Sequence, residues 1–361
     1  MNGTMTWVGL DVHARSTHGA AIDVETGELK RARFGAGSEE VVKWLGELDQ
    51  PARAFYEAGP TGFALYRAGR AAGLEIDVIA PGKTARPRAD RVKTDRKDAE
   101  LLARLGLAGQ LKPIAVPSEF VESARHLMRA REQLRGDLLR ARHRVSKLLL
   151  QHGRVYPEPT TWNQRHRAWL GRQRFEQEAT ELAFIDLLAA VDGMVARKEA
   201  LDERLSRLAT DERLWPTVAR LRAFRGVGTL TALALHLELG GDWERFSSPR
   251  RLFSWLGLTP SLEQSGESKA QGSITKTGSH YARRLLVEAA WHYSRQPRIG
   301  VTLQNRQQGQ PDHVLQIAWR AQHRLHRLRT RLKARGKPAN VATVAVAREL
   351  SGFLWAAATA P

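Results

Sequence analysis

The sequence predicts an N-terminal α/β domain followed by two mainly helical regions. Over residues 1–115, short apolar runs typical of strands alternate with amphipathic segments typical of helices. An antiparallel hairpin precedes this alternation, which indicates a mixed sheet. From about residue 118, apolar residues recur at three- and four-residue steps, the period of a helix. We therefore expect an α/β domain at 1–115, a helical coiled-coil arm at 116–213 and a mainly helical C-terminal domain at 214–361.

Apolar runs and the turn residues between them indicate the elements of the first domain. Residues 6–12 (TWVGLDV) form an apolar run that ends in an acid, as a buried strand would. The turn at 25–28 separates two further strand-like segments and predicts a hairpin. The remaining predictions are helices at 39–48 and 62–73, strands at 53–57 and 75–80, and a helix that begins near residue 94.

Two long amphipathic stripes dominate the middle of the chain. The first runs from Ala124 to Leu148 and the second from Phe184 to Leu208. Two such helices joined by a connector are typical of a coiled-coil arm. A dimerising arm and an ordinary helical hairpin packed on the rest of the chain are both compatible with this pattern.

The C-terminal region combines helical segments with two polar features. Gly226-Val227-Gly228 lies between two helical patterns and resembles a helix-hairpin-helix turn, in which backbone N–H groups can hold a phosphate. A plain tight turn is the alternative. Residues 265–279 are rich in Ser and Gly and predict a loop, and residues 313–335 predict a basic amphipathic helix.

The charge of the chain indicates a polyanionic partner. With 57 Lys and Arg against 38 Asp and Glu, the formal net charge is +19. Such a field attracts nucleic acids, because each neutralised phosphate releases counterions. The sequence contains no cysteine, which excludes disulfides and thiolate zinc sites.

The chain shows neither a secretory leader nor an uninterrupted membrane span. The start MNGTMTWVGLDVH lacks a basic segment and a long apolar run. The apolar stretch 341–358 is interrupted by Arg348 and Glu349. We expect a soluble, cytoplasmic, nucleoid-associated protein without a membrane partner.

Four carboxylates have the placement that a metal centre requires. Asp11 and Glu57 end two predicted strands that plausibly lie side by side, whereas Asp95 and Asp98 are three apart in a predicted helix and share one face. Four converging anions repel one another unless a divalent cation neutralises them, and hard oxygen ligands suit Mg²⁺ or Mn²⁺. Two such ions can clamp the attacking and leaving oxygens of a phosphoryl transfer.

Each of the helical acids also has a purely structural interpretation. Asp95 would be favoured in the first turn by the helix dipole, and Asp98 could pair with a nearby lysine. The surrounding cations would line the approach of a phosphate backbone. They are Arg86, Arg88, Arg91, Lys93, Arg96 and Lys97.

Several separated blocks resemble one family. GLDVH at 9–13, FYEAGPTG at 55–62 and KTDRKDA at 93–99 are similar to blocks of the DEDD transposases of insertion sequence family one hundred and ten. The segments at 225–235 and 246–286 resemble the C-terminal transposase domain of that family. Both ends of the chain are covered in the right order, and only the middle arm is unspecific.

The resemblance implies an RNase H-like, RuvC-like first domain and a recombinase that acts on donor and target DNA. It further implies a structured non-coding bridge RNA as guide, a serine of the second domain that becomes joined to DNA, and a tetramer. GLTP followed by four residues and Ser-Gly places that serine at Ser265. Other serines of the same segment are alternatives, namely Ser261, Ser268 and Ser273.

Three cations follow the serine segment on the loop and the next predicted helix. Lys276, Arg283 and Arg284 are expected to contact phosphates. A RuvC-type nuclease that uses water as its nucleophile is the first alternative function. A non-catalytic nucleic-acid-binding protein that kept the fold and the basic surface is the second.

Overall fold

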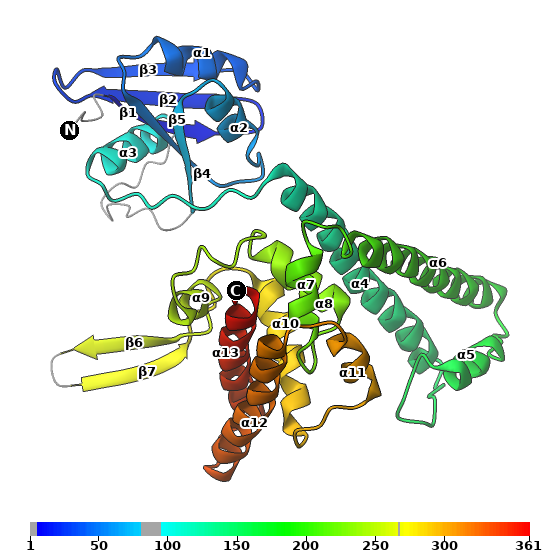
Figure 1. Cartoon of the computed structure of the whole chain (residues 1–361). Helices are drawn as coiled ribbons and strands as arrows, with labels where there is room; N and C mark the ends of the chain where they lie inside the picture. Colours follow the sequence, from blue (N-terminus) through cyan, green and yellow to red (C-terminus); the bar gives the residue numbers. More distant parts are fainter. Residues whose placement is uncertain (1–5, 81–94, 266–267) are drawn as a thin grey trace. The chain divides into compact units, whose positions relative to one another are not determined.

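The computed structural model describes residues 6–80, 95–265 and 268–361, with the backbone alone at 263–265 and 268–271. The chain divides into two compact units, Met1–Val116 and Pro117–Pro361. Each unit has its own hydrophobic core and is described by itself (Figure 1).

The first unit is built on a five-stranded mixed sheet. The strands are β1 (Thr6–Val12), β2 (Thr17–Asp23), β3 (Leu29–Phe34), β4 (Ala52–Glu57) and β5 (Glu75–Ile79). Their spatial order is β3-β2-β1-β4-β5, with antiparallel pairing among the first three and parallel pairing of β1 with β4 and of β4 with β5. This topology confirms the predicted mixed α/β sheet of the first unit and is compatible with an RNase H-like domain.

Three helices cover this sheet. They are α1 (Glu39–Glu47), α2 (Ala64–Ala71) and α3 (Asp95–Leu107). Figure 1 shows α3 on one side of the sheet and α1 and α2 on the other. The core beneath α1 and α2 includes Val8 and Leu10 of β1, packed with Val41, Leu45 and other buried side chains. Because strand residues alternate between faces, Gly9 and Asp11 belong to the face that α3 covers.

The second unit begins with the predicted pair of long helices. They are α4 (Glu119–Gln151) and α6 (Glu178–Leu208), and the connector between them contains the short helix α5 (Gln164–Gly171). The distal halves of α4 and α6 enclose a hydrophobic cluster that contains Leu138 and Val191. The start of α4 instead contributes Val121 and Met128 to the main core. The pair therefore forms a helical hairpin whose base is built into the unit.

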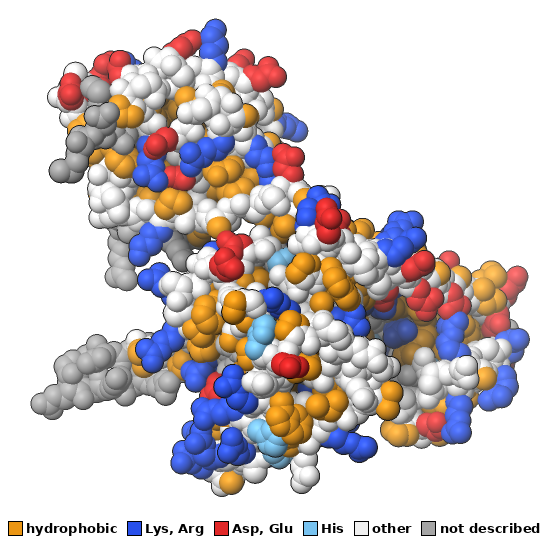
Figure 2. Space-filling view, in the orientation of Figure 1, with side chains coloured by type: hydrophobic (Ala, Val, Ile, Leu, Met, Phe, Trp, Pro, Cys, Tyr) orange, Lys and Arg blue, Asp and Glu red, His pale blue; other side chains and the backbone are white. Residues whose placement is uncertain are grey.

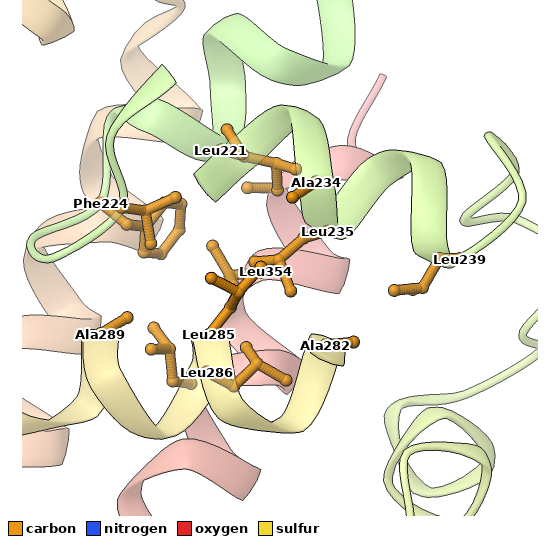
Figure 3. Close-up of a cluster of buried hydrophobic side chains, with 14 of the residues drawn as sticks. Leu221, Phe224, Ala234, Leu235, Leu239, Ala282, Leu285, Leu286, Ala289 and Leu354 are labelled. Atoms are coloured by element: carbon orange, nitrogen blue, oxygen red, sulfur yellow. The ribbon is translucent and has the colours of Figure 1, made fainter. Parts of the chain in front are cut away.

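The remaining helices form a bundle around one large core. They are α7 (Trp215–Arg222), α8 (Thr229–Glu238), α9 (Pro249–Trp255), α10 (His280–Trp291), η1 (His292–Ser294), α11 (Val301–Gln307), α12 (Asp312–Ala334) and α13 (Ala339–Ala358). Figure 3 shows Leu221 and Phe224 facing Leu285 and Leu286 of α10, with Leu354 of α13 between them. All five side chains are buried.

The helix α13 is long and apolar enough to span a membrane by length and composition. Several of its side chains, including Val346, Leu350 and Leu354, are nevertheless fully buried in the core of the second unit. The helix therefore has the environment of a core helix.

An ion pair with a buried carboxylate connects three helices of the second unit. The carboxylate of Glu238, at the end of α8, accepts a hydrogen bond of 2.8 Å from Arg129 Nε of α4. It also accepts one of 2.6 Å from the Ser279 hydroxyl, and the same hydroxyl caps α10 by accepting from the backbone N–H of Ala282. Burial raises the pKa of the Glu238 carboxyl, but these partners outweigh burial and hold its pKa below the usual range.

A β-hairpin replaces most of the loop predicted at 265–279. The strands β6 (Pro260–Ser265) and β7 (Ser268–Ile274) pair in antiparallel fashion and extend away from the helices in Figure 1. The loop prediction was wrong because it relied on Ser and Gly content. A polar two-stranded ribbon lacks the apolar alternation that identifies a half-buried strand.

Candidate metal centre

The sheet register brings two of the four predicted carboxylates together. The last parallel pair between β1 and β4 is Leu10 with Tyr56. Asp11 and Glu57 each follow that pair by one residue, at the carboxyl ends of adjacent strands. Side chains at matching register positions share one face of a sheet, so both carboxylates belong to the face that α3 covers. Both residues are half-buried.

A glycine in β1 allows α3 to lie directly on the sheet. A Cβ atom at Gly9 would be 2.0 Å from the carbonyl oxygen of Ala99 and 2.6 Å from the backbone nitrogen of Ala103. Any side chain at this position would push α3 away from β1. The contact places the first turn of α3, with Asp95 and Asp98, near the end of β1.

The carboxylates surround a cavity of about 360 Å³. Asp11, Glu57 and Asp98 line it, together with His13 and the segment 58–61 after β4. The fourth carboxylate, Asp95, is connected to the group through His13, whose Nε2 lies 3.6 Å from Asp95 Oδ1.

Two histidines belong to this cluster and were missed by the sequence reasoning. His13 Nε2 lies 3.0 Å from Asp11 Oδ2, and His18 Nε2 on β2 lies 3.9 Å from Asp95 Oδ2. Since alternate residues of an extended chain share a face, the two-residue spacing of Asp11 and His13 was a signal for the first. The second depends on the register that pairs Asp11 with His18.

The pKa of the Asp11 carboxyl responds to burial and to the neighbouring acids. Burial raises the pKa of its carboxyl above the usual range, and the hydrogen bond and charge of His13 oppose that rise. The negative charges of Asp95 and Asp98 raise the pKa further. The charged form of Asp11 is thus disfavoured in the protein alone, and a bound cation would relieve this.

The donor set fits a divalent cation. One ligand atom each from Asp11, His13 and Asp95 lie within 4.8 Å of one another. Carboxylate oxygens are the ligands of Mg²⁺ and Mn²⁺, and an imidazole is more readily accepted by Mn²⁺ than by Mg²⁺. The cluster can therefore hold a metal ion through side chains of β1 and α3 and the residue that follows β1.

The other predicted site residues belong to other segments of the chain. Ser265 is the last residue of β6, where it pairs with Ser268 of β7, and the structure describes its backbone alone. Its rival Ser261 donates a hydrogen bond of 3.2 Å to the carbonyl of Ser273. Four of the cations predicted around Asp95 and Asp98 lie outside the described residues, namely Arg86, Arg88, Arg91 and Lys93.

The three cations predicted after the serine segment differ in their surroundings. Lys276 is exposed and has a backbone φ of +57°. Arg283 donates to the carbonyls of Leu256, Thr277 and Gly278, so its guanidinium binds the loop before α10. Arg284 forms ion pairs with two acids, Glu132 at 2.7 Å and Glu288.

Clustered acids at the strand ends of a mixed α/β unit are typical of metal-dependent enzymes that transfer phosphoryl groups. Comparison with known proteins identifies the family. Residues 8–153 match the family model of DEDD transposases, and residues 218–304 match that of the IS116/IS110/IS902 transposase family.

Relatives along the whole chain agree with the family models. The chain is 38% identical to a putative transposase y4qE of Sinorhizobium fredii, over 98% of this chain and 88% of that protein. It is 32% identical to the transposase for insertion sequence element IS1533 of Leptospira borgpetersenii, over 89% of this chain and 94% of that protein. The chain therefore belongs to the IS110 family of transposases, which makes it an enzyme of DNA transposition. Membership of a DEDD family also indicates a divalent metal.

Proposed function

We propose that this transposase is an RNA-guided DNA recombinase that combines a Mg²⁺-binding carboxylate centre with a covalent serine intermediate. The convergence of Asp11, Glu57 and Asp98 on one cavity carries the metal part of the proposal. The resemblance of the segments at 225–235 and 246–286 supports the serine, and the family resemblance alone supports the guide RNA and the tetramer.

In the proposed reaction, the Oγ of Ser265 attacks a DNA phosphodiester. The hydroxyl loses its proton, a P–O bond to the serine forms, and the P–O bond to one DNA oxygen breaks. That oxygen leaves as a hydroxyl end after taking up a proton. Attack by the hydroxyl of a second DNA end reverses these changes and releases the serine, so the bond energy is conserved for rejoining.

The carboxylates contribute by holding the cation and fixing its position. Asp11, Glu57, Asp95 and Asp98 would bind it, and His13 would orient Asp11 through their 3.0 Å contact. These residues would hold a divalent ion, and the chemistry that it would supply is neutralisation of negative charge on a phosphate and a lowered pKa of a hydroxyl group.

A recombination assay tests this function with donor and target plasmids, the non-coding flank of the element supplied as RNA, and Mg²⁺. We expect a protein–DNA adduct that survives denaturation, and we expect Ser265→Ala to abolish both adduct and product. The matched controls Ser261→Ala and Ser273→Ala should retain both.

The other outcomes separate the alternatives. Cleavage without an adduct would indicate a RuvC-type nuclease in which water attacks. Full product from the Ser265→Ala protein would exclude Ser265 as the nucleophile, and product without the RNA would exclude guidance. Specific DNA binding without any Mg²⁺-dependent cleavage or exchange would indicate a non-catalytic binding protein.

A further inference from the structure

The second unit contains a cavity of about 860 Å³ with a strongly basic lining. It lies between the Gly226-Val227-Gly228 turn and the segment from η1 to α11. Its cationic and titratable lining residues are Arg225, His292, Arg295, Arg298 and Arg306. None of the lining residues is acidic. We call this cavity the basic turn pocket.

The guanidinium groups at the base of the pocket are held by neutral acceptors. Arg225 donates to the carbonyl of Gln296 at 2.8 Å and to that of Arg298 at 2.8 Å. Arg306 donates to the carbonyl of Val227 at 2.5 Å, and its buried Nε has no hydrogen-bond partner. These contacts fix the side chains without cancelling their charge.

The rim cations are free of carboxylates as well. Arg295 and Arg298 are exposed. Within the described part of the chain, neither they nor Arg225 and Arg306 form an ion pair. By contrast, Arg129 and Arg284 of the same unit are paired with glutamates. A bound anionic ligand would neutralise the positive charge of these arginines, which no described carboxylate neutralises.

The turn adds backbone donors to the side-chain charges. Gly226 has a φ of +80°, and a Cβ there would be 2.6 Å from the carbonyl of Ala289. The turn therefore requires glycine and is pressed against α10. Gly228 caps the ten-residue helix α8 without a side-chain hydrogen bond, and no atom lies within 4 Å of a Cβ built on it. The first N–H groups of α8 thus begin at an open edge of the pocket.

The field inside the pocket is positive. Burial lowers the pKa of the His292 imidazole below its usual range, and the charges of Arg295, Arg225 and Arg306 lower it further. His292 is therefore neutral near pH 7 and available as a hydrogen-bond donor.

We propose that the basic turn pocket binds the phosphodiester backbone of a nucleic acid. Four arginines, an uncapped helix start and the absence of acids among its lining residues suit phosphate oxygens. A volume of about 860 Å³ exceeds that of a single phosphate and leaves room for flanking sugars. The pocket needs no metal and does not depend on the carboxylate centre or on Ser265.

The test replaces the two rim arginines, whose side chains form no hydrogen bond or ion pair with a described residue. Binding of the full chain to labelled duplex DNA, single-stranded DNA and single-stranded RNA of one length is measured in EDTA over a range of salt concentrations. For Arg295→Gln/Arg298→Gln, we expect weaker binding by about tenfold or more. The log–log salt slope should shrink by about 1.8 for duplex DNA or about 1.4 for a single strand.

A matched control separates the pocket from net charge. Arg197 and Arg204 are exposed on α6 and form no ion pair with a described residue, so Arg197→Gln/Arg204→Gln removes the same charge elsewhere. It should leave the slope within experimental error. Thr302→Glu, which adds an anion to the pocket lining, should weaken binding as the arginine changes do.

The ligand most affected by the rim variants identifies the natural source of the backbone, DNA or RNA. An unchanged salt slope for all three ligands would overturn the proposal. Equal losses in the α6 control would also overturn it, because the effect would then be that of net charge alone. The rim variants are also measured in a protein that carries Ser265→Ala. If they weaken binding there as well, the effect is independent of the recombinase mechanism, whether or not that protein is active.

Discussion

Two of the cavities of this transposase have opposite electrostatics. The acidic cavity of the first unit is lined by three carboxylates, and the basic turn pocket of the second unit is lined by four arginines. The first repels a phosphate until a cation is bound, whereas the second attracts one directly. In the two proposals above, binding and chemistry therefore use separate charges, since the acidic cavity offers carboxylate ligands for a metal and the lining of the basic turn pocket contains no acid.

The visible surface carries one marked group of basic side chains. Figure 2 shows Lys and Arg side chains gathered around the end of α12, while basic and acidic side chains are mixed over the rest of the visible face. This group is one local patch within the formal charge of +19. Such patches concentrate nucleic acid near the enzyme without specifying a sequence.

Loss of Asp11 should have the largest effect. Asp11→Asn removes a ligand from the centre of the acidic cavity, and we expect strand exchange to fall by about 10³-fold or more, corresponding to about 4 kcal/mol. Nucleic-acid binding in EDTA should remain unchanged, whereas the rim variants should weaken it. Exchange and binding are measured on the same preparations.

The control for Asp11 is Glu47→Gln, which removes one exposed acid from α1 on the opposite face of the sheet. It should retain exchange. If Asp11→Asn instead weakens metal-free binding as much as the rim variants do, the separation of binding from chemistry is wrong.

The second prediction concerns how the acidic cavity is assembled. Gly9→Ala would place a Cβ 2.0 Å from a backbone oxygen of α3, and backbone atoms cannot move aside as a flexible side chain can. We expect the free energy of unfolding of the first unit to fall by about 3 kcal/mol, with loss of exchange as Asp95 and Asp98 move. Chemical denaturation and the exchange assay measure these effects.

Gly46→Ala serves as the control because no atom lies within 4 Å of a Cβ at Gly46 on α1. That change should leave exchange intact and stabilise the helix by about 0.5–1 kcal/mol. Equal effects of the two substitutions would show that the close contact of α3 with β1 does not position the acids.

The contrast also shows what the sequence can predict. Asp11 and Glu57 were found because each ends an apolar strand, and local patterning reveals strand ends. The position of α3 depends on a contact between Gly9 and residues some 90 positions later, which no local pattern contains. The basic turn pocket could be predicted even less well from the sequence, in which only its glycine turn forms a local pattern. The two sides of the pocket are joined by contacts between distant segments, such as the hydrogen bond from Arg225 to the carbonyl of Arg298.

The structure divides into two compact units, and the predicted division into three parts at 1–115, 116–213 and 214–361 remains a proposal. The stripes on α4 and α6 correctly predicted two long helices, since helical periodicity is kept in any packing environment. Whether that arm also joins copies of the chain depends on a partner surface that helical periodicity does not identify.

The smallest expected effect concerns Glu238, which is buried among cations of the second unit. Glu238→Gln keeps the shape of the side chain but removes its charge. Arg129 is half exposed and remains hydrated, so we expect a loss of about 2 kcal/mol at pH 7 and an intact basic turn pocket. The free energy of unfolding is compared with that of Glu288→Gln, which breaks an exposed pair and should cost less than about 1 kcal/mol.

The pH dependence of that difference provides the decisive measurement. The folded protein holds the pKa of Glu238 below its ordinary value of 4.5. The stabilisation is therefore complete above about pH 4.5 and is lost as the pH falls through the lower folded pKa. The difference in stability between the native chain and Glu238→Gln should shrink over that acidic range. A difference that stays constant down to the acid transition would mean that the side chain acts through packing alone.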